Sequence, residues 1–200
     1  KKRWYLFSAL LLLWILFKVS FVLYEGLSRP VYSWDAWTIW SSGAKFFYYE
    51  KGLSLDPSGE FFFGLGYRAI LGYPLLSPLV EVWISLFLGE FHEIYSKALV
   101  PFYFIALIGI FFFTLKRETN SAAALVGTAF LSSVPILTYH ATDAYADLLL
   151  AYYGFCGVIC FLRYIKAGRK NLLSLCGILI AMGIFTKNEG VFFAAVTAVS

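Results

Sequence analysis

Residues 4–24 read WYLFSALLLLWILFKVSFVLY, an apolar run whose single charged residue is Lys18. As an α-helix this run would rise about 31 Å at about 1.5 Å per residue, which is enough to cross the hydrocarbon core of a bilayer. Lys18 lies near its far end, where a long side chain can reach the interface. The run is longer than the apolar core of a signal peptide, so it predicts a retained membrane-spanning helix.

The rest of the chain has the same apolar character. Hydrophobic residues make up 60% of the 200 residues and charged residues only 14%. These fractions exclude a soluble domain and predict an integral membrane protein. No basic patch is large enough for a phosphate backbone, so no nucleic acid is expected as a partner. The three cysteines lie in apolar runs and predict neither disulfides nor a zinc site.

Further apolar runs are expected to be helices, at 98–115, 122–139, 148–162, 172–185 and 191–200. Residues 73–89 are also apolar, but Ser77, Glu81 and Ser85 recur every four residues and would form one polar stripe on a helix. We expect that helix to lie in the membrane interface or to re-enter without crossing. Because the chain ends inside an apolar run, we expect it to be the N-terminal part of a longer protein that continues beyond Ser200.

Three basic clusters determine the predicted topology, at residues 1–3, 116–117 and 163–170. Lysine and arginine are enriched in cytoplasmic loops, so an even number of crossings should separate each cluster from the next. Six crossings satisfy this condition if 73–89 does not cross. The sequence therefore predicts an all-α, multi-pass bundle with a long outer loop, residues 25–97, which carries interfacial helices, one of them within 34–49.

Three polar clusters then fall on the outer side: SWDAWTIW at 33–40, YHATDAYAD at 139–147 and TKNEG at 186–190. Charged groups next to apolar spans usually face a cavity or a partner. On a helix, Asp143 and Asp147 would share a face and could bind a cation or position a substrate. Alternatively, Asp35 and Asp143 are helix N-caps. For Lys187 and Glu189 the alternative is an ordinary solvated loop.

Four motifs, in this order, resemble those of membrane glycosyltransferases of the GT-C fold: WDAWTIW at 34–40 with Ala44-Lys45, GYPLLSP at 72–78, YAD at 145–147 and TKNEG at 186–190. In these motifs the chain resembles the N-terminal part of bacterial protein mannosyltransferases and lipid A aminoarabinose transferases. This resemblance implies transfer of a sugar from a polyprenyl-phosphate donor to a protein, lipid or glycan acceptor, at the outer face of the bacterial inner membrane. The mannosyltransferases tend to carry two adjacent acids, whereas Ala36 follows Asp35 here.

In the mechanism that the resemblance implies, Asp35 matches the catalytic acid of the first outer loop and removes the proton of the acceptor. Lys187 and Arg68 are candidate cations for the lipid phosphate. The other predicted substrate-binding residues are Tyr73, His140, Asp143, Asp147 and Glu189. A divalent cation held by Asp143 and Asp147 is compatible with this scheme but is not required by it.

Two other classes remain open from the sequence. In a transporter or channel subunit, the same acids would bind a coupling ion. Against this alternative, most of the acids fall in predicted loops or at helix ends, and no inverted repeat is visible. A structural membrane scaffold is the third class, and it would leave the long aromatic loop unexplained.

Overall fold

The computed structural model describes residues 2–53 and 72–199, together with their side chains except at both ends of the chain. The described residues are all-helical, with no strand among them, which confirms the predicted class. The helices are α1 (Lys2–Ser28), the π-helical turn η1 (Ala36–Trp40), α2 (Ser41–Glu50), α4 (Leu76–Leu88), α5 (Val100–Glu118), α6 (Ser121–Ser133), α7 (Pro135–Thr142), α8 (Ala146–Ala167), α9 (Lys170–Thr186) and α10 (Gly190–Val199). The stretch LSLDPSGEFFFGLG at 53–66 predicts turns, and it lies almost entirely outside the described residues.

Three helices are long and apolar enough to cross a membrane, namely α1, α5 and α8. Helices α6 and α7 together pass the same test as a bent pair, whereas α4 and α9 are shorter apolar helices. These helices indicate a membrane protein, as the composition predicts. By length and composition, they account for up to four of the six predicted crossings.

The exposed surface of α1 supports contact with lipid. Ile15 and Val22 are buried, but Tyr5, Leu6 and Leu13 are each more than 60% exposed. A helix that is apolar around its whole circumference and buries only one narrow stripe is suited to a hydrocarbon environment and not to water.

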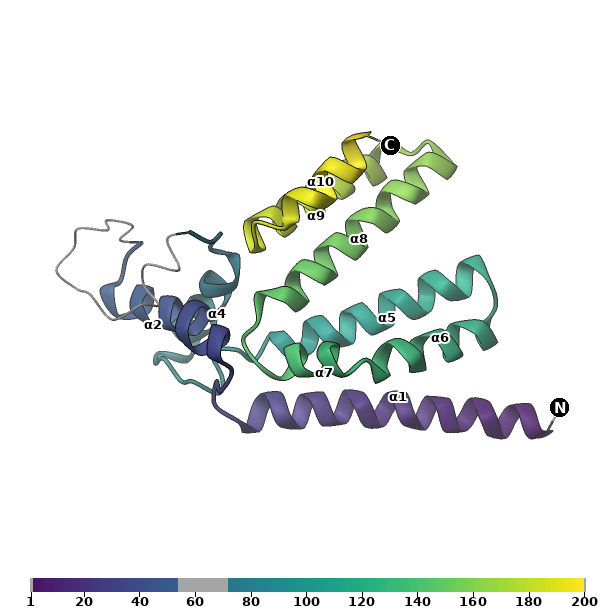
Figure 1. Cartoon of the computed structure of the whole chain (residues 1–200), viewed down its shortest axis with the longest axis horizontal. Coiled ribbons are helices and arrows are strands. Elements are labelled where there is room, and N and C mark those ends of the chain that lie inside the picture. Colours follow the sequence, from purple (N-terminus) through teal and green to yellow (C-terminus); the bar gives the residue numbers. More distant parts are fainter. Residues whose placement is uncertain (1, 54–71, 200) are drawn as a thin grey trace.

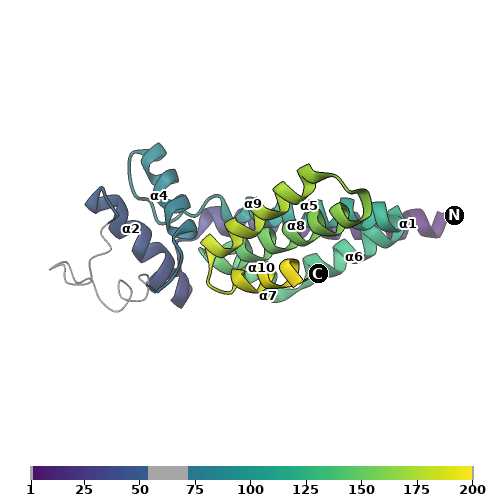
Figure 2. The ribbon, with the colours of Figure 1, turned by 90° about the horizontal axis from the view of Figure 1, so that it is seen from above.

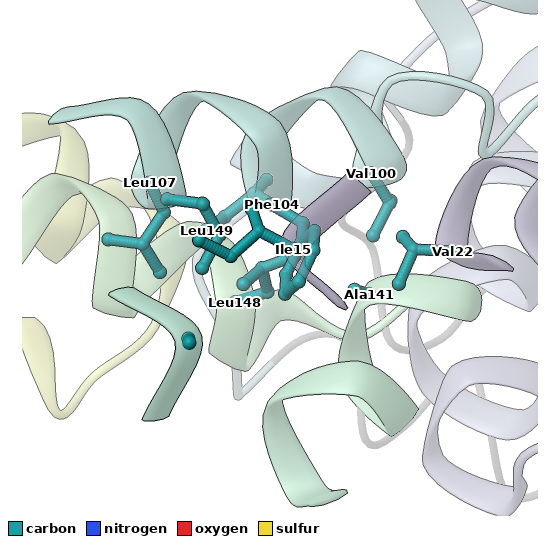
Figure 3. Close-up of a cluster of buried hydrophobic side chains, with 10 residues drawn as sticks. Ile15, Val22, Val100, Phe104, Leu107, Ala141, Leu148 and Leu149 are labelled. Carbon is teal, nitrogen blue, oxygen red and sulfur yellow. The ribbon is translucent and has the colours of Figure 1, made fainter. Parts of the chain in front are cut away.

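The hydrophobic core lies where α1, α5, α7 and α8 meet. Figure 3 shows Val22 of α1, Val100 and Phe104 of α5, Ala141 of α7 and Leu148 of α8 gathered in one cluster. Phe104 is fully buried there. This packing holds the ends of four helices together at the same end of the bundle.

A break separates α6 from α7, where the sequence predicted one uninterrupted helix over 122–139. The two helices are bent by 64° at Val134, which has an extended backbone with φ −65° and ψ 116°. Proline lacks an N–H and restricts the preceding residue to extended conformations, so Pro135 can begin a new helix but cannot continue α6. The prediction of a single helix is therefore wrong in this respect.

Helices α2 and α4 lie together beyond one end of the bundle in both views (Figures 1 and 2). We call this end the α4 end; α1, α7 and α9 finish there, and α5, α8 and α10 begin there. Helix α4 lies beyond the ends of the long helices, and that residues 73–89 do not cross the membrane stays a prediction. The helix predicted within 34–49 is also present, as η1 and α2.

The polar stripe of α4 faces the protein. Ser77, Glu81 and Ser85 are each at most 3% exposed, whereas Trp83 and Phe87 on the same helix are 63% and 88% exposed. The prediction of an interfacial helix left the orientation of this stripe open. Because α4 buries its polar side and exposes its apolar side, the environment of its exposed face is expected to be apolar.

Candidate functional site

The three predicted polar clusters meet at the α4 end of the bundle. Asp143 Oδ2 accepts hydrogen bonds from the backbone N–H groups of Tyr32, at 3.2 Å, and Ser33, at 2.7 Å. Lys187 Nζ donates a hydrogen bond of 2.8 Å to Asp147 Oδ1. The fold thus brings the segment before Asp35 next to the turn after α7, and the turn after α9 next to the start of α8.

Asp35 is exposed at the first turn of a continuous helical run that begins at Trp34. The N–H of Trp37 donates to the carbonyl of Ser33 at 2.8 Å, so Ser33 and not Asp35 stands at the N-cap position. Among the described residues, no capping hydrogen bond of the Asp35 side chain is present, and the N-cap alternative is therefore wrong. A carboxylate in a first helical turn is favoured by the helix dipole and remains free to contact a ligand.

The π-helical turn η1 follows Asp35 directly. Such turns are rare and frequently occur at functional sites. Trp40, at its end, is buried, and its ring meets that of Tyr73 edge to face with centroids 5.2 Å apart. The predicted substrate-binding residue Tyr73 is therefore held against the helical run that carries Asp35.

His140 and Tyr145 form a stacked pair at the same end, with ring centroids 4.4 Å apart and planes 18° apart. Burial, the neighbouring Tyr139 and the charge of Asp35 together raise the pKa of Tyr145 to about 12. The carboxylates of Asp35 and Asp147 and the ammonium of Lys187 all act electrostatically on His140. The predicted residues His140, Asp147 and Lys187 thus share one electrostatic environment with Asp35.

Lys187, in the turn between α9 and α10, contacts two acids: Asp147 of α8 and Glu189 of the same turn. Its Nζ lies 2.8 Å from Asp147 Oδ1 and 3.6 Å from Glu189 Oε1. Burial lowers the pKa of Lys187, but the hydrogen bond to Asp147 and the charges of both acids outweigh this effect and raise the pKa overall. Lys187 is therefore a permanent cation, and this turn is more organised than the solvated loop that was the alternative.

A groove of about 280 Å³ runs from the α6–α7 break along α8. Its lining is apolar apart from His140 and Asp147: Leu131, Val134, Ile136, Leu137, Leu148 and Ala151. An apolar groove with a few convergent polar groups is typical of a site for a small molecule or a lipid chain.

Asp143 has a different environment from the one predicted. It is completely buried, its Oδ1 accepts the N–H of Ala144 at 2.9 Å, and Lys97 Nζ lies 4.0 Å away. Its backbone is extended and α8 begins only at Ala146, so Asp143 and Asp147 do not share a helical face. The structure therefore gives Asp143 a role in holding loops together, in place of the predicted substrate or metal contact and of the alternative N-cap role.

No group of three or more histidine, cysteine, aspartate or glutamate side chains in the described parts of the chain is placed to hold a metal ion. Arg68, the second predicted phosphate partner, lies outside the described residues.

Lys97 and Glu81 are the charged residues whose role the sequence did not reveal. Lys97 is 1% exposed and donates a hydrogen bond of 2.7 Å to the carbonyl of Thr142. Glu81 is 2% exposed and accepts a hydrogen bond of 2.7 Å from Ser41 Oγ. For Glu81, the polar stripe on residues 73–89 was the one feature of the sequence that indicated a special position. Lys97 is a single lysine just before an apolar run, and nothing in this pattern predicts that it is buried.

Burial, with a smaller effect of the nearby charges, favours the protonated form of Glu81. Burial and the charge of the nearby Asp143 outweigh the hydrogen bond from Ser41 and the charge of Lys97, and the pKa of Glu81 rises to about 8. One ammonium, Lys97, faces two buried carboxyl groups, so the cluster is electrically balanced when Asp143 is ionised and Glu81 is protonated. We call Ser41, Glu81, Lys97 and Asp143 the buried polar cluster.

No protein-family model, no curated protein and no solved structure matches this chain. A function is therefore inferred from the geometry of the α4 end and from the motifs found there.

Proposed function

We propose that this chain belongs to a multi-pass membrane glycosyltransferase with a GT-C-like bundle. It would transfer a sugar from a polyprenyl-phosphate donor to a protein, lipid or glycan acceptor at the outer face of the bacterial inner membrane. The observation that carries the proposal is the state of Asp35, an exposed carboxylate without a capping role, at the end of the bundle where His140, Asp147 and Lys187 also gather.

In this reaction the acceptor hydroxyl or amine attacks the anomeric carbon while the lipid phosphate leaves. Asp35 takes the proton of the acceptor as the new glycosidic bond forms. Lys187 has three N–H donors and remains charged, so it can bind the leaving phosphate while keeping its contact with Asp147. The buried polar cluster positions the segment of Asp35 through the hydrogen bonds of Asp143 to Tyr32 and Ser33.

The location of the site suits a donor that is a lipid. Trp34 and Trp37, which flank Asp35, are 71% and 58% exposed. Tryptophans favour the membrane–water interface, which is the depth at which the phosphate of a lipid-borne donor would lie. The apolar groove beside His140 and Asp147 is compatible with part of its hydrocarbon chain.

The test is sugar transfer by the protein as its gene encodes it, reconstituted in liposomes with polyprenyl-phosphate mannose and polyprenyl-phosphate aminoarabinose as donors. Asp35→Asn retains the shape of the side chain but removes its ability to take a proton, so turnover should fall by roughly 10²–10⁴-fold. Donor binding should be unchanged. Glu50→Gln, which neutralises another exposed acid on α2, should leave turnover unchanged.

Near-normal turnover by the Asp35→Asn variant would remove Asp35 from the mechanism. Ion flux through the liposomes without any transfer of sugar would instead support the transporter or channel alternative.

A further inference from the structure

A second pocket lies between the C-terminal parts of α5 and α8. These parts are at the end of the bundle opposite the α4 end, where α6 and α9 begin (Figure 1). We call this end the basic end. The pocket has a volume of about 310 Å³. Its lining residues come from α5 and α8, and they are Thr114, Glu118, Ile159, Leu162, Arg163 and Lys166.

Two polar atoms at this pocket are buried without a partner. Thr114 is 9% exposed, and no group in the described parts of the chain hydrogen-bonds to its Oγ1. The same is true of Nε of Arg163, whose N–H is buried. A buried donor without an acceptor destabilises a protein, and more so when the donor is charged, so both groups are expected to have a partner in the membrane.

The charged residues around the pocket indicate that this partner is negatively charged. Segments 112–122 and 160–172 contain six basic residues and one acid. The basic residues are Lys116, Arg117, Arg163, Lys166, Arg169 and Lys170. The acid, Glu118, lines the pocket, but Lys166 Nζ lies 2.6 Å from its Oε2 and balances its charge. The guanidinium of Arg163 therefore remains available for an anion.

The apolar part of the lining indicates that the anion is attached to a hydrocarbon chain. Ile159 and Leu162 of α8 line the pocket beside the polar atoms, and Leu162 is 48% exposed. Both α5 and α8 are long and apolar enough to span a membrane, so their ends are expected at the depth of the lipid headgroups. Basic pockets between membrane helices are known to bind phosphorylated headgroups.

We propose that this pocket binds the phosphate of an anionic phospholipid, with Arg163 and Thr114 donating hydrogen bonds to the phosphate oxygens and the lipid chain lying along Ile159 and Leu162. A guanidinium can donate two parallel hydrogen bonds to one phosphate, which makes it more selective than a lysine at the same place. This proposal does not depend on the proposed glycosyltransferase activity, because the pocket and the candidate site lie at opposite ends of the bundle.

The test measures binding of dioleoyl phosphatidylglycerol to the delipidated full chain in a non-ionic detergent, by native mass spectrometry. Dioleoyl phosphatidylcholine and free glycerol phosphate serve as comparison ligands. The lipid is equilibrated with the protein at roughly 0.5 M salt, where the Debye length is only a few Å and distant surface charges contribute little. The wild-type chain should bind phosphatidylglycerol about tenfold more tightly than phosphatidylcholine.

Arg163→Gln should weaken binding of phosphatidylglycerol by about tenfold, because it removes a charge-assisted pair of hydrogen bonds. Thr114→Val, which removes one hydroxyl with almost no change of shape, should weaken it by about threefold. Arg117→Gln is the matched control, since it removes the same charge from an exposed side chain that does not line the pocket. It should change binding by less than about twofold.

Equal losses in the Arg163→Gln and Arg117→Gln variants would overturn the proposal, because binding would then follow the total charge of this end. Equal affinity for the two lipids, or for glycerol phosphate alone, would also overturn it. If Arg163→Gln fails to fold, as judged by thermal unfolding, the nearly isosteric Thr114→Val variant decides the question: unchanged binding would refute the proposed contact.

Discussion

The ammonium of Lys97 lies 4.0 Å from Oδ1 of Asp143, and the two side chains are at most 1% exposed. Lys97 also donates a hydrogen bond to the carbonyl of Thr142, and Asp143 accepts the backbone N–H groups of Tyr32 and Ser33. This pair therefore links three connections: the one after α1, the one before α5 and the one after α7. The connection after α1 leads directly into the helical run that carries Asp35.

Replacing Lys97 should destabilise the protein strongly. Lys97→Met retains most of the side-chain volume but leaves Asp143 as an uncompensated buried charge, which typically costs about 3–5 kcal/mol. The matched control is Lys45→Met, because Lys45 and Glu93 form a pair of 3.1 Å in which both side chains are about half exposed. An exposed pair is worth about 1 kcal/mol or less. Unfolding by dodecyl sulfate in mixed micelles measures both variants, and similar small losses would contradict the assigned role of Lys97.

Stability should fall with rising pH because of Glu81. The carboxyl group has a pKa of about 8 in the folded protein against an ordinary value of 4.5. At a pH between these two values it is protonated in the folded state and ionised in the unfolded state, so unfolding releases a proton. This contribution is complete below about pH 4.5 and is lost as the pH rises to about 8. Glu81→Gln imitates the protonated acid and should remove this dependence, so that the variant is more stable than the wild type at pH 8, by about 1–4 kcal/mol.

Unfolding curves of both proteins at pH 5, 6, 7 and 8 test this prediction. Subtracting one series from the other isolates Glu81 from the other titrating groups. Two parallel curves would show that Glu81 is ionised in the folded state.

The close approach of α9 and α10 should not tolerate a side chain at Gly190. A Cβ there would collide with the carbonyl group of Gly183 and lie 2.5 Å from the backbone N of Ile184. Since backbone cannot move aside cheaply, Gly190→Ala should cost about 2 kcal/mol and disturb the neighbouring pair of Lys187 and Glu189. Gly177→Ala in α9 is the control, because its Cβ would meet nothing within 4 Å. It should stabilise the helix by up to about 1 kcal/mol, and an equal response of both variants in thermal unfolding would contradict the packing described.

The predicted orientation can be tested at the two ends of the bundle. Glu50→Cys and Ser121→Cys, each in a background without the three native cysteines, place an exposed thiol at the α4 end and at the basic end. Because basic residues favour the cytoplasmic side, a membrane-impermeant maleimide should label the Glu50→Cys variant but not the Ser121→Cys variant in intact cells. Inverted vesicles should show the reverse pattern, and labelling of both variants in intact cells would refute the orientation.

Much of the fold could be predicted because membrane helices are defined by local patterns. The run at 4–24 became α1, and the runs at 98–115 and 148–162 became α5 and α8 with their ends moved by a few residues. The break at Pro135 had a signal in the sequence, since a proline inside a helical pattern usually ends or bends the helix. The size of the bend depends on how α6 and α7 pack against the other helices, which the sequence does not predict.

The candidate site was predicted less completely. The three polar clusters were expected at one end of the bundle, and they meet there. The prediction that Asp143 and Asp147 have the same role was wrong. Asp143 is buried beside Lys97, whereas Asp147 is one third exposed and pairs with Lys187. Spacing along the chain could not distinguish them, since the helix that would align them begins only after Asp143.

The sequence by itself determined that the chain is helical and apolar and which of its segments carry charge, because helix formation and transfer into hydrocarbon depend on residues that are neighbours along the chain. Only the tertiary structure decided that Lys97, Asp143 and Glu81 share one interior, that the stripe of α4 turns inward and that Asp35 remains exposed. These outcomes depend on which connections between helices come together, and the free energy of a buried charge depends on its partners in space, wherever they stand in the sequence.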